Sequence, residues 1–163
     1  MSPVVILDAD LLSAFLKIGR LPLVREFYRV ERLYAPPAVY REVAVTDLLL
    51  HILAFPWVTV ESPSSTQMQA LLSDSVFTVL GAGEQEAIAL ALDRPESVLL
   101  MNDNQARRLA ARRGVNVVNI PAFLLACKLA GLLNRQAMSQ LVAALQEKDH
   151  YGFRRDVLDM LMS

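Results

Sequence analysis

The chain has 163 residues, of which 54% are hydrophobic and 20% charged, and a formal net charge of −1. This length predicts one domain with a substantial apolar core. The slight acidity excludes a protein that attracts nucleic acid through its overall charge, so any such binding must depend on a local basic patch.

Nothing in the sequence predicts a membrane protein. The longest apolar run, 48–60, is interrupted by His51 and Pro56, and a spanning helix needs about 20 apolar residues. The start, MSPVVILDAD, lacks the basic segment of a signal peptide. Cys127 is the only cysteine, which excludes an intramolecular disulfide and fits a reducing compartment. We therefore expect a cytoplasmic protein.

Strands and helices are predicted to alternate along the first part of the chain. Residues 3–7 (PVVIL) form a short, unalternating β-branched run, which is typical of a central parallel strand. Further strands are expected at 33–35 and, at a sheet edge, 57–60. Helices are expected at 10–17, 21–28, 39–54 and 67–72.

The segment 79–114 carries the most distinctive pattern. A Gly81-Ala82-Gly83 turn leads into an alanine-rich helix that contains Glu84 and Glu86. The apolar run 97–101 predicts a buried strand, and a helix with four arginines begins at Asp103. A strand at 115–120 and helices at 121–130, 135–147 and 153–162 complete the prediction.

This alternation predicts an α/β fold, a three-layer α/β/α sandwich with a central parallel sheet and right-handed crossovers. We expect a single domain, 1–163. Its α/β core would be formed by 1–133, and 134–163 would be a C-terminal helical extension.

Four acids lie at or near predicted strand ends and helix starts: Asp8, Glu42, Glu84 and Asp103. The carboxyl ends of parallel strands are where open α/β sheets bind ligands. An aspartate at a helix start is also a common N-cap, worth ~1 kcal/mol, and this interpretation stays open for Asp8 and Asp10. Glu42 is expected near the inward face of its helix because Val39 and Val43 flank it.

Clustered carboxylates repel one another by ~1 kcal/mol in water at 4 Å and ~4 kcal/mol at an effective dielectric of 20. Such a cluster must take up protons or bind cations. Oxygen-only ligands select hard ions such as Mg²⁺ or Mn²⁺, which points to metal-assisted phosphodiester hydrolysis. Arg107 and Arg108 could then contact phosphates, although an arginine-rich helix face is also commonly just solvated.

Other catalytic groups are missing from the sequence. His51 and His150 lack metal-ligand spacing, and Cys127 lies in an apolar helix as a core residue would. No P-loop lysine, dinucleotide fingerprint or serine-nucleophile motif is present.

Four segments in order resemble the PIN-domain family of metal-dependent ribonucleases. They are VVILDADLL, PPAVYREV, LGAGEQEAIALA and VLLMNDNQARRLAARRGV. The branch that they resemble best is that of the prokaryotic predicted nucleic-acid-binding PIN proteins. Its members often have two aspartates where this chain has Asn102 and Asp103.

The resemblance implies an acidic metal pocket made by Asp8, Glu42, Glu84 and Asp103, with Asp10, Glu86 and Asn102 around it. Whether Glu84 or Glu86 is the third acid stays open. The implied activity is Mg²⁺- or Mn²⁺-dependent cleavage of single-stranded RNA. The implied assembly is a homodimer, with the toxin half of a toxin–antitoxin pair as one role and an antitoxin protein as partner.

Two other classes remain. Asn102 removes one charge from the site, which favours a non-catalytic nucleic-acid- or protein-binding module with a degenerate PIN fold. A flavodoxin-like phosphoacceptor domain would also place acids at strand ends, but it needs a buried lysine, and Lys128 in a helix is a poor candidate.

Overall fold

The computed structural model describes residues 2–163. Its centre is a five-stranded sheet in which all neighbouring strands are parallel, in the order β3-β2-β1-β4-β5. The strands are β1 (Val4–Leu7), β2 (Leu33–Ala35), β3 (Val58–Val60), β4 (Ser97–Leu100) and β5 (Val117–Val118). The strands β2 and β3 lie on one side of β1, whereas β4 and β5 lie on its other side. The strand order therefore reverses between β1 and β4.

The helices that precede β4 are α1 (Ala9–Lys17), α2 (Leu21–Tyr28), α3 (Pro37–Ala44), α4 (Leu49–Leu53), α5 (Ser65–Leu72), the 3₁₀ helix η1 (Ser75–Val79) and α6 (Ala82–Asp93). Those that follow it are α7 (Asn104–Arg112), α8 (Ile120–Leu129), α9 (Arg135–Lys148) and α10 (Arg155–Met162).

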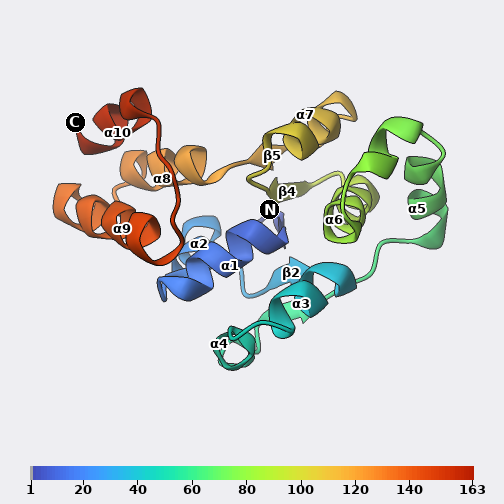
Figure 1. Cartoon of the computed structure of the whole chain (residues 1–163), viewed down its shortest axis with the longest axis horizontal. Helices are drawn as coiled ribbons and strands as arrows, with labels where there is room; N and C mark the ends of the chain where they lie inside the picture. The colour runs from blue at the N-terminus through green and yellow to red at the C-terminus, as the bar shows by residue number, and fades with distance from the viewer. Residues whose placement is uncertain (1) are drawn as a thin grey trace.

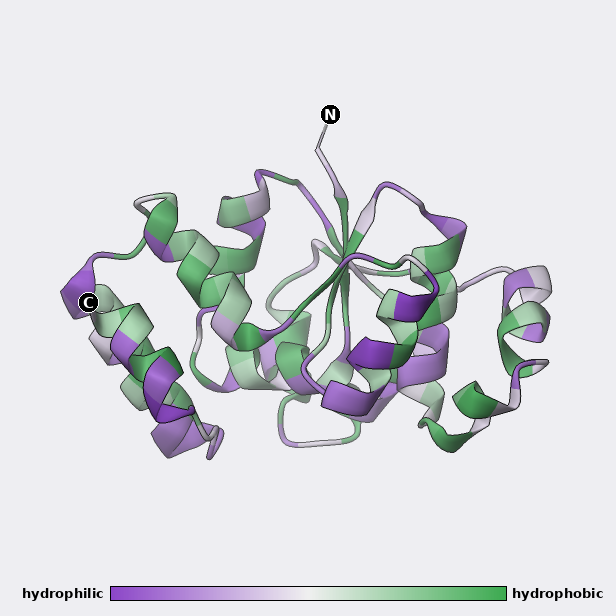
Figure 2. Ribbon diagram, turned by 90° about the horizontal axis from the view of Figure 1, so that it is seen from above, coloured by the Kyte–Doolittle hydropathy of each residue, from purple (hydrophilic) through white to green (hydrophobic). Residues whose placement is uncertain are grey.

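Apolar side chains bury both faces of the sheet. Val5 and Leu7 of β1 belong to a cluster with α1, α2, α8 and α9, whereas Ile6 belongs to another with α6 and α7. This division follows from the strand, in which successive side chains point to opposite faces. Figure 1 shows α8, α9 and α10 to one side of the sheet and α5 and α6 to the other, and Figure 2 shows the strands between these helices. The predicted three-layer α/β/α sandwich is confirmed.

Two predicted elements were wrong in extent. The helix expected at 39–54 is interrupted between α3 and α4. There the Thr46 hydroxyl donates to the Val43 carbonyl at 2.6 Å and accepts from the Leu48 N–H at 3.1 Å, so a side chain replaces helical partners. The strand expected at 115–120 is only β5, because Asn119 accepts from the Ala122 N–H at 3.0 Å and thereby begins α8.

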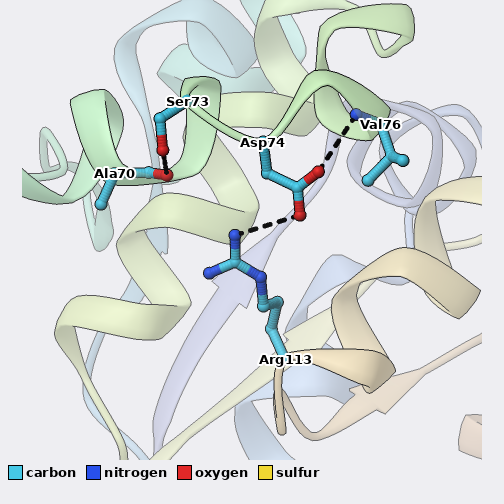
Figure 3. A network of polar contacts seen from close by, with 5 residues as sticks. All are labelled: Ala70, Ser73, Asp74, Val76 and Arg113. Atoms are coloured by element: carbon cyan, nitrogen blue, oxygen red, sulfur yellow. Dashed lines mark hydrogen bonds and ion pairs between the residues drawn. The ribbon is translucent and has the colours of Figure 1, made fainter.

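The helix η1 was not predicted, and it is fixed to the end of α7. The Asp74 carboxylate accepts from the Val76 N–H at 3.3 Å and from Arg113 Nη2 at 3.5 Å (Figure 3). The Arg113 guanidinium also lies over the Phe77 ring, 5.1 Å from its centroid. Arg113 therefore has a structural role. In the described part of the chain, no helix combines the length and apolarity needed to cross a membrane.

Candidate metal-binding site

The ends of β1 and β4 lie side by side at the point where the strand order reverses. The Asp8 N–H donates to the Leu100 carbonyl at 2.9 Å, so the pairing of the two strands continues past the end of β1. Asp103 follows the end of β4 by three residues. A crevice at such a reversal, beyond the carboxyl ends of the strands, is the usual ligand site of an open α/β sheet.

Asp8 and Asp103 both occupy N-cap positions, but only Asp103 acts as a cap. The Asp103 Oδ2 atom accepts from the Ala106 N–H at 2.8 Å. The side chain of Asp8 makes no capping hydrogen bond. Only 2% of Asp8 is exposed, and its Oδ1 atom is buried without a partner within residues 2–163. Capping therefore does not explain an aspartate at position 8.

Four carboxylates face one cleft of about 200 Å³. They come from the end of β1 and the helices α1, α3 and α6: Asp8, Asp10, Glu42 and Glu84. Glu42 is exposed, so the expectation that it lies on an inward face was wrong. Asp103 does not line the cleft, although its charge acts on both Asp10 and Glu84.

Gly83 allows α6 to approach α3 closely at this cleft. A Cβ atom at position 83 would lie 3.3 Å from Val39 Cγ2 and 3.7 Å from Glu42 Oε1. The contact with Val39 would be tight and that with Glu42 an ordinary one, so the missing side chain lets α6 pack closely against the helix that carries Glu42.

The two glutamates of α6 have different surroundings. Glu84 lines the cleft, and its Oε1 atom accepts from the Gly81 N–H at 3.1 Å. Glu86 does not line the cleft; its Oε1 atom accepts from the Ala38 N–H, in the first turn of α3, at 3.0 Å. Of the two glutamates, only Glu84 lines the cleft, which favours it over Glu86 as the third acid of the proposed metal pocket.

The cleft disfavours negative charge. The pKa of Asp8 is raised to about 7, mainly by burial and to a smaller extent by the nearby carboxylates of Glu84, Asp10 and Glu42, against the lowering effect of the Ala9 N–H. The pKa values of Asp10 and Glu84 are also raised, mainly by desolvation and then by repulsion from Asp103. A cation bound in the cleft would relieve this repulsion.

The donor set fits a divalent cation of the hard class, because it consists of carboxylate oxygens. The buried, unpartnered Oδ1 atom of Asp8 is an acceptor that such an ion would satisfy. Among residues 2–163, however, no three acidic, histidine or cysteine side chains are close enough to hold an ion by themselves. An ion in this cleft would therefore have to keep several waters of its own, as Mg²⁺ usually does.

Asn102 has two structural partners that sequence reasoning missed. Its Oδ1 atom accepts from the Ile120 N–H at 3.3 Å and from the Tyr151 hydroxyl at 3.1 Å. Asn102 thus joins the end of β4 to α8 and to the segment between α9 and α10. Nothing in the sequence pattern connects Tyr151 with a strand end 49 residues earlier.

The two arginines proposed for RNA differ in availability. Arg108 is exposed, whereas Arg107 is half-buried and donates from Nη2 to Asn104 Oδ1 at 2.5 Å. Lys128, considered for a phosphoacceptor site, instead binds the carbonyl of Met160 and the hydroxyl of Ser163 near the C-terminus.

Fold and site together define a parallel α/β domain with an acidic cleft beyond the carboxyl ends of its central strands. A family model described as a PIN domain matches residues 4–161. The chain therefore belongs to the PIN-domain family, as its motifs predicted. PIN domains are generally nucleases and typically use divalent metal ions. No curated protein matches the sequence.

Proposed function

We propose that this protein is a Mg²⁺- or Mn²⁺-dependent endoribonuclease that cleaves single-stranded RNA at the acidic cleft. The observation that carries the proposal is Asp8, whose buried Oδ1 atom lacks a partner in a cleft shared with three other carboxylates. Such an arrangement destabilises the metal-free protein, and carboxylates with strongly raised pKa values in a cleft are typical of functional sites.

Asp8, Glu42 and Glu84 would hold the ion, which when bound supplies an activated water and stabilises charge on the phosphodiester. The positive charge of the ion would offset the repulsion among these carboxylates, so that they would lose their protons more readily. Asp103 keeps α7 in place through its cap and adds negative charge beside the cleft. Arg108 would contact phosphates of the RNA, and Arg107 would do so if its hydrogen bond to Asn104 broke. Such contacts would make RNA binding weaken as the salt concentration rises.

The test is incubation of a labelled single-stranded RNA with the protein and Mn²⁺, Mg²⁺ or EDTA. We expect cleavage with either ion and none with EDTA. Asp8→Asn should lower the cleavage rate by at least about 100-fold, because it removes a proposed metal ligand and even groups that only orient such ligands are worth about 10–100-fold in metal affinity or activity. Asp47→Asn, a matched change at an exposed turn residue outside the cleft, should cleave normally. Undiminished cleavage by Asp8→Asn would refute the assignment.

Glu84→Gln and Glu86→Gln distinguish the two candidates for the third acid in the same assay. Both amides keep an oxygen that can accept the hydrogen bond from Gly81 or Ala38. We expect Glu84→Gln to abolish cleavage and Glu86→Gln to retain it; the reverse result would move the site to Glu86.

A non-catalytic binding module is the second candidate. The wide spacing of the carboxylates and the structural use of Asn102 favour it. Calorimetric titration with Mn²⁺ separates the two functions, since a protein that neither binds the ion nor cleaves RNA would support the module.

The homodimer, the antitoxin partner, the toxin role and the cytoplasmic location stay predictions. Large apolar side chains are exposed at and before α4: Val45, Leu49, Leu50 and Leu53. Sedimentation equilibrium of the purified protein would measure its oligomeric state directly.

A further inference from the structure

A second cavity, of about 260 Å³, adjoins the acidic cleft and is called the side cavity below. Asp10 lines both spaces. The other walls of the side cavity come from α1, from the end of β4, from the start of α8 and from the segment between α9 and α10. They include Ser13, Lys17, Asn102, Asp149 and Tyr151. A polymeric substrate held at the acidic cleft would have this space beside it.

The charge of the side cavity does not suit a phosphate. Lys17 Nζ is paired with Asp149 Oδ1 at 2.9 Å, which leaves the carboxylate of Asp10 without a cation among the ion pairs of residues 2–163. Two acids and one lysine give the walls a net charge of −1. An anionic group would be repelled there, whereas the uncharged base and ribose of a nucleotide would not.

Neutral hydrogen-bonding groups in the side cavity remain available. The Oδ1 atom of Asn102 is occupied by two donors, and its amide N–H groups have no partner in the described chain. The Ser13 hydroxyl has none either within residues 2–163. These groups, with the Asp10 carboxylate, can bond the polar edge of a base or a ribose hydroxyl.

Tyr151 is an aromatic residue in the wall of the side cavity, and it is held in place from several sides. Its hydroxyl donates to Asn102 Oδ1, and its N–H donates to the Leu145 carbonyl at 3.1 Å. Its ring packs against Phe153 with the centroids 4.7 Å apart. The preceding residue, His150, has a φ of 54°, a left-handed conformation that reverses the chain after α9. The wall is therefore formed before any ligand arrives.

We propose that the side cavity is a nucleoside subsite, in which Tyr151 and Asn102 hold a base and ribose of single-stranded RNA beside the phosphate at the acidic cleft. The inference rests on the proposed function, from which it takes single-stranded RNA as the substrate. Tyr151 is a substrate-binding residue here, because aromatic side chains stack unpaired bases.

Two measurements test the subsite with one fluorescein-labelled single-stranded RNA: KM and kcat in Mn²⁺, and Kd by anisotropy in EDTA. Tyr151→Leu keeps an apolar side chain but loses the ring. We expect it to raise KM and Kd about tenfold or more, within the range for stacking one base, and to change kcat less than about threefold. Tyr151→Phe, which keeps the ring, should restore most of the affinity.

Tyr34→Leu is the matched control, because Tyr34 is also half-buried and lines a different cavity. If Tyr151→Leu left Kd and KM unchanged, or changed them no more than Tyr34→Leu, the subsite would be refuted while cleavage by the wild type still stood. If the wild type bound RNA without cleaving it, the proposed nuclease would fail, and a weaker Kd for Tyr151→Leu alone would still support the subsite. An absence of RNA binding would overturn both.

Discussion

Asp8 should make the stability of the metal-free protein fall as the pH rises. Its pKa is raised from 3.8 to about 7 in the folded state, so folding favours the protonated form. The stabilisation is complete below about pH 4 and is lost as the pH rises through about 7. At pH 8 the free energy of unfolding should therefore be lower than at pH 4 by about 4 kcal/mol through Asp8. Asp10 and Glu84 shift in the same direction, and Glu42 adds charge from α3.

Urea unfolding in EDTA at pH 5 and pH 8 measures this effect. Asp8→Asn should be more stable than the wild type at pH 8, and the difference between them should shrink towards pH 4. Saturating Mn²⁺ should stabilise the wild type at pH 8, since an ion that binds only the folded state adds its binding free energy. Equal pH dependence in both proteins would show that Asp8 is not the group responsible.

Sequence reasoning found the acids but not their individual roles. The same pattern, a strand followed by aspartate and a helix, occurs at Asp8 and Asp103, and only the latter caps its helix. Glu84 and Glu86 are likewise alike in sequence. Their roles depend on whether Gly81 or Ala38 donates to them, and the second contact spans 48 residues.

The close approach of α3 and α6 depends on Gly83. In a helix, Gly→Ala usually stabilises by about 0.5–1 kcal/mol. Here the added methyl group would meet Val39, which is fully buried and stiff, and overpacking costs about 1–3 kcal/mol. We expect Gly83→Ala to lower the free energy of unfolding by roughly 1 kcal/mol. It should also slow RNA cleavage, because α3 carries Glu42.

Gly81→Ala is the control for that substitution, since φ at Gly81 is −68° and a Cβ atom there meets only Glu84 Oε1, at 3.7 Å. Its unfolding free energy should stay within about 0.5 kcal/mol of the wild type. If both variants behaved alike in urea unfolding and in cleavage, the contact between the helices would not be tight.

Elements defined by local pattern were predicted well, and those defined by a single contact were not. The apolar runs of β1 and β4 end at polar residues, so their bounds were predicted within a residue or so. The break between α3 and α4 depends on the hydroxyl of Thr46, and η1 depends on Asp74 and Arg113. Hydrophobic periodicity contains no information about such side-chain bonds.

At the scale of the molecule, the C-terminal helices share the core of the α/β part. Met138, Leu141 and Leu145 of α9 and Leu161 of α10 belong to the same apolar cluster as Val5 and Leu7 of β1. Without α9, the apolar faces of α1 and its neighbours would be exposed to water. We therefore expect residues 1–163 to unfold as one cooperative unit, and a fragment 1–133 to lack a cooperative transition.

Trp57, the only tryptophan, lies next to β3, so its fluorescence reports on the sheet while far-UV circular dichroism reports mainly on the helices. In urea the two transitions of the whole chain should coincide, as a two-state domain requires. The fragment 1–153, which lacks α10, loses the buried side chain of Leu161 and the partly buried ones of Val157, Leu158 and Met162. It should stay cooperative, with a loss of at least about 1.5–3 kcal/mol. If the fragment 1–133 unfolded cooperatively and were as stable as the whole chain, α9 and α10 would be a separate unit. The core of residues 1–133 would then be stable without them.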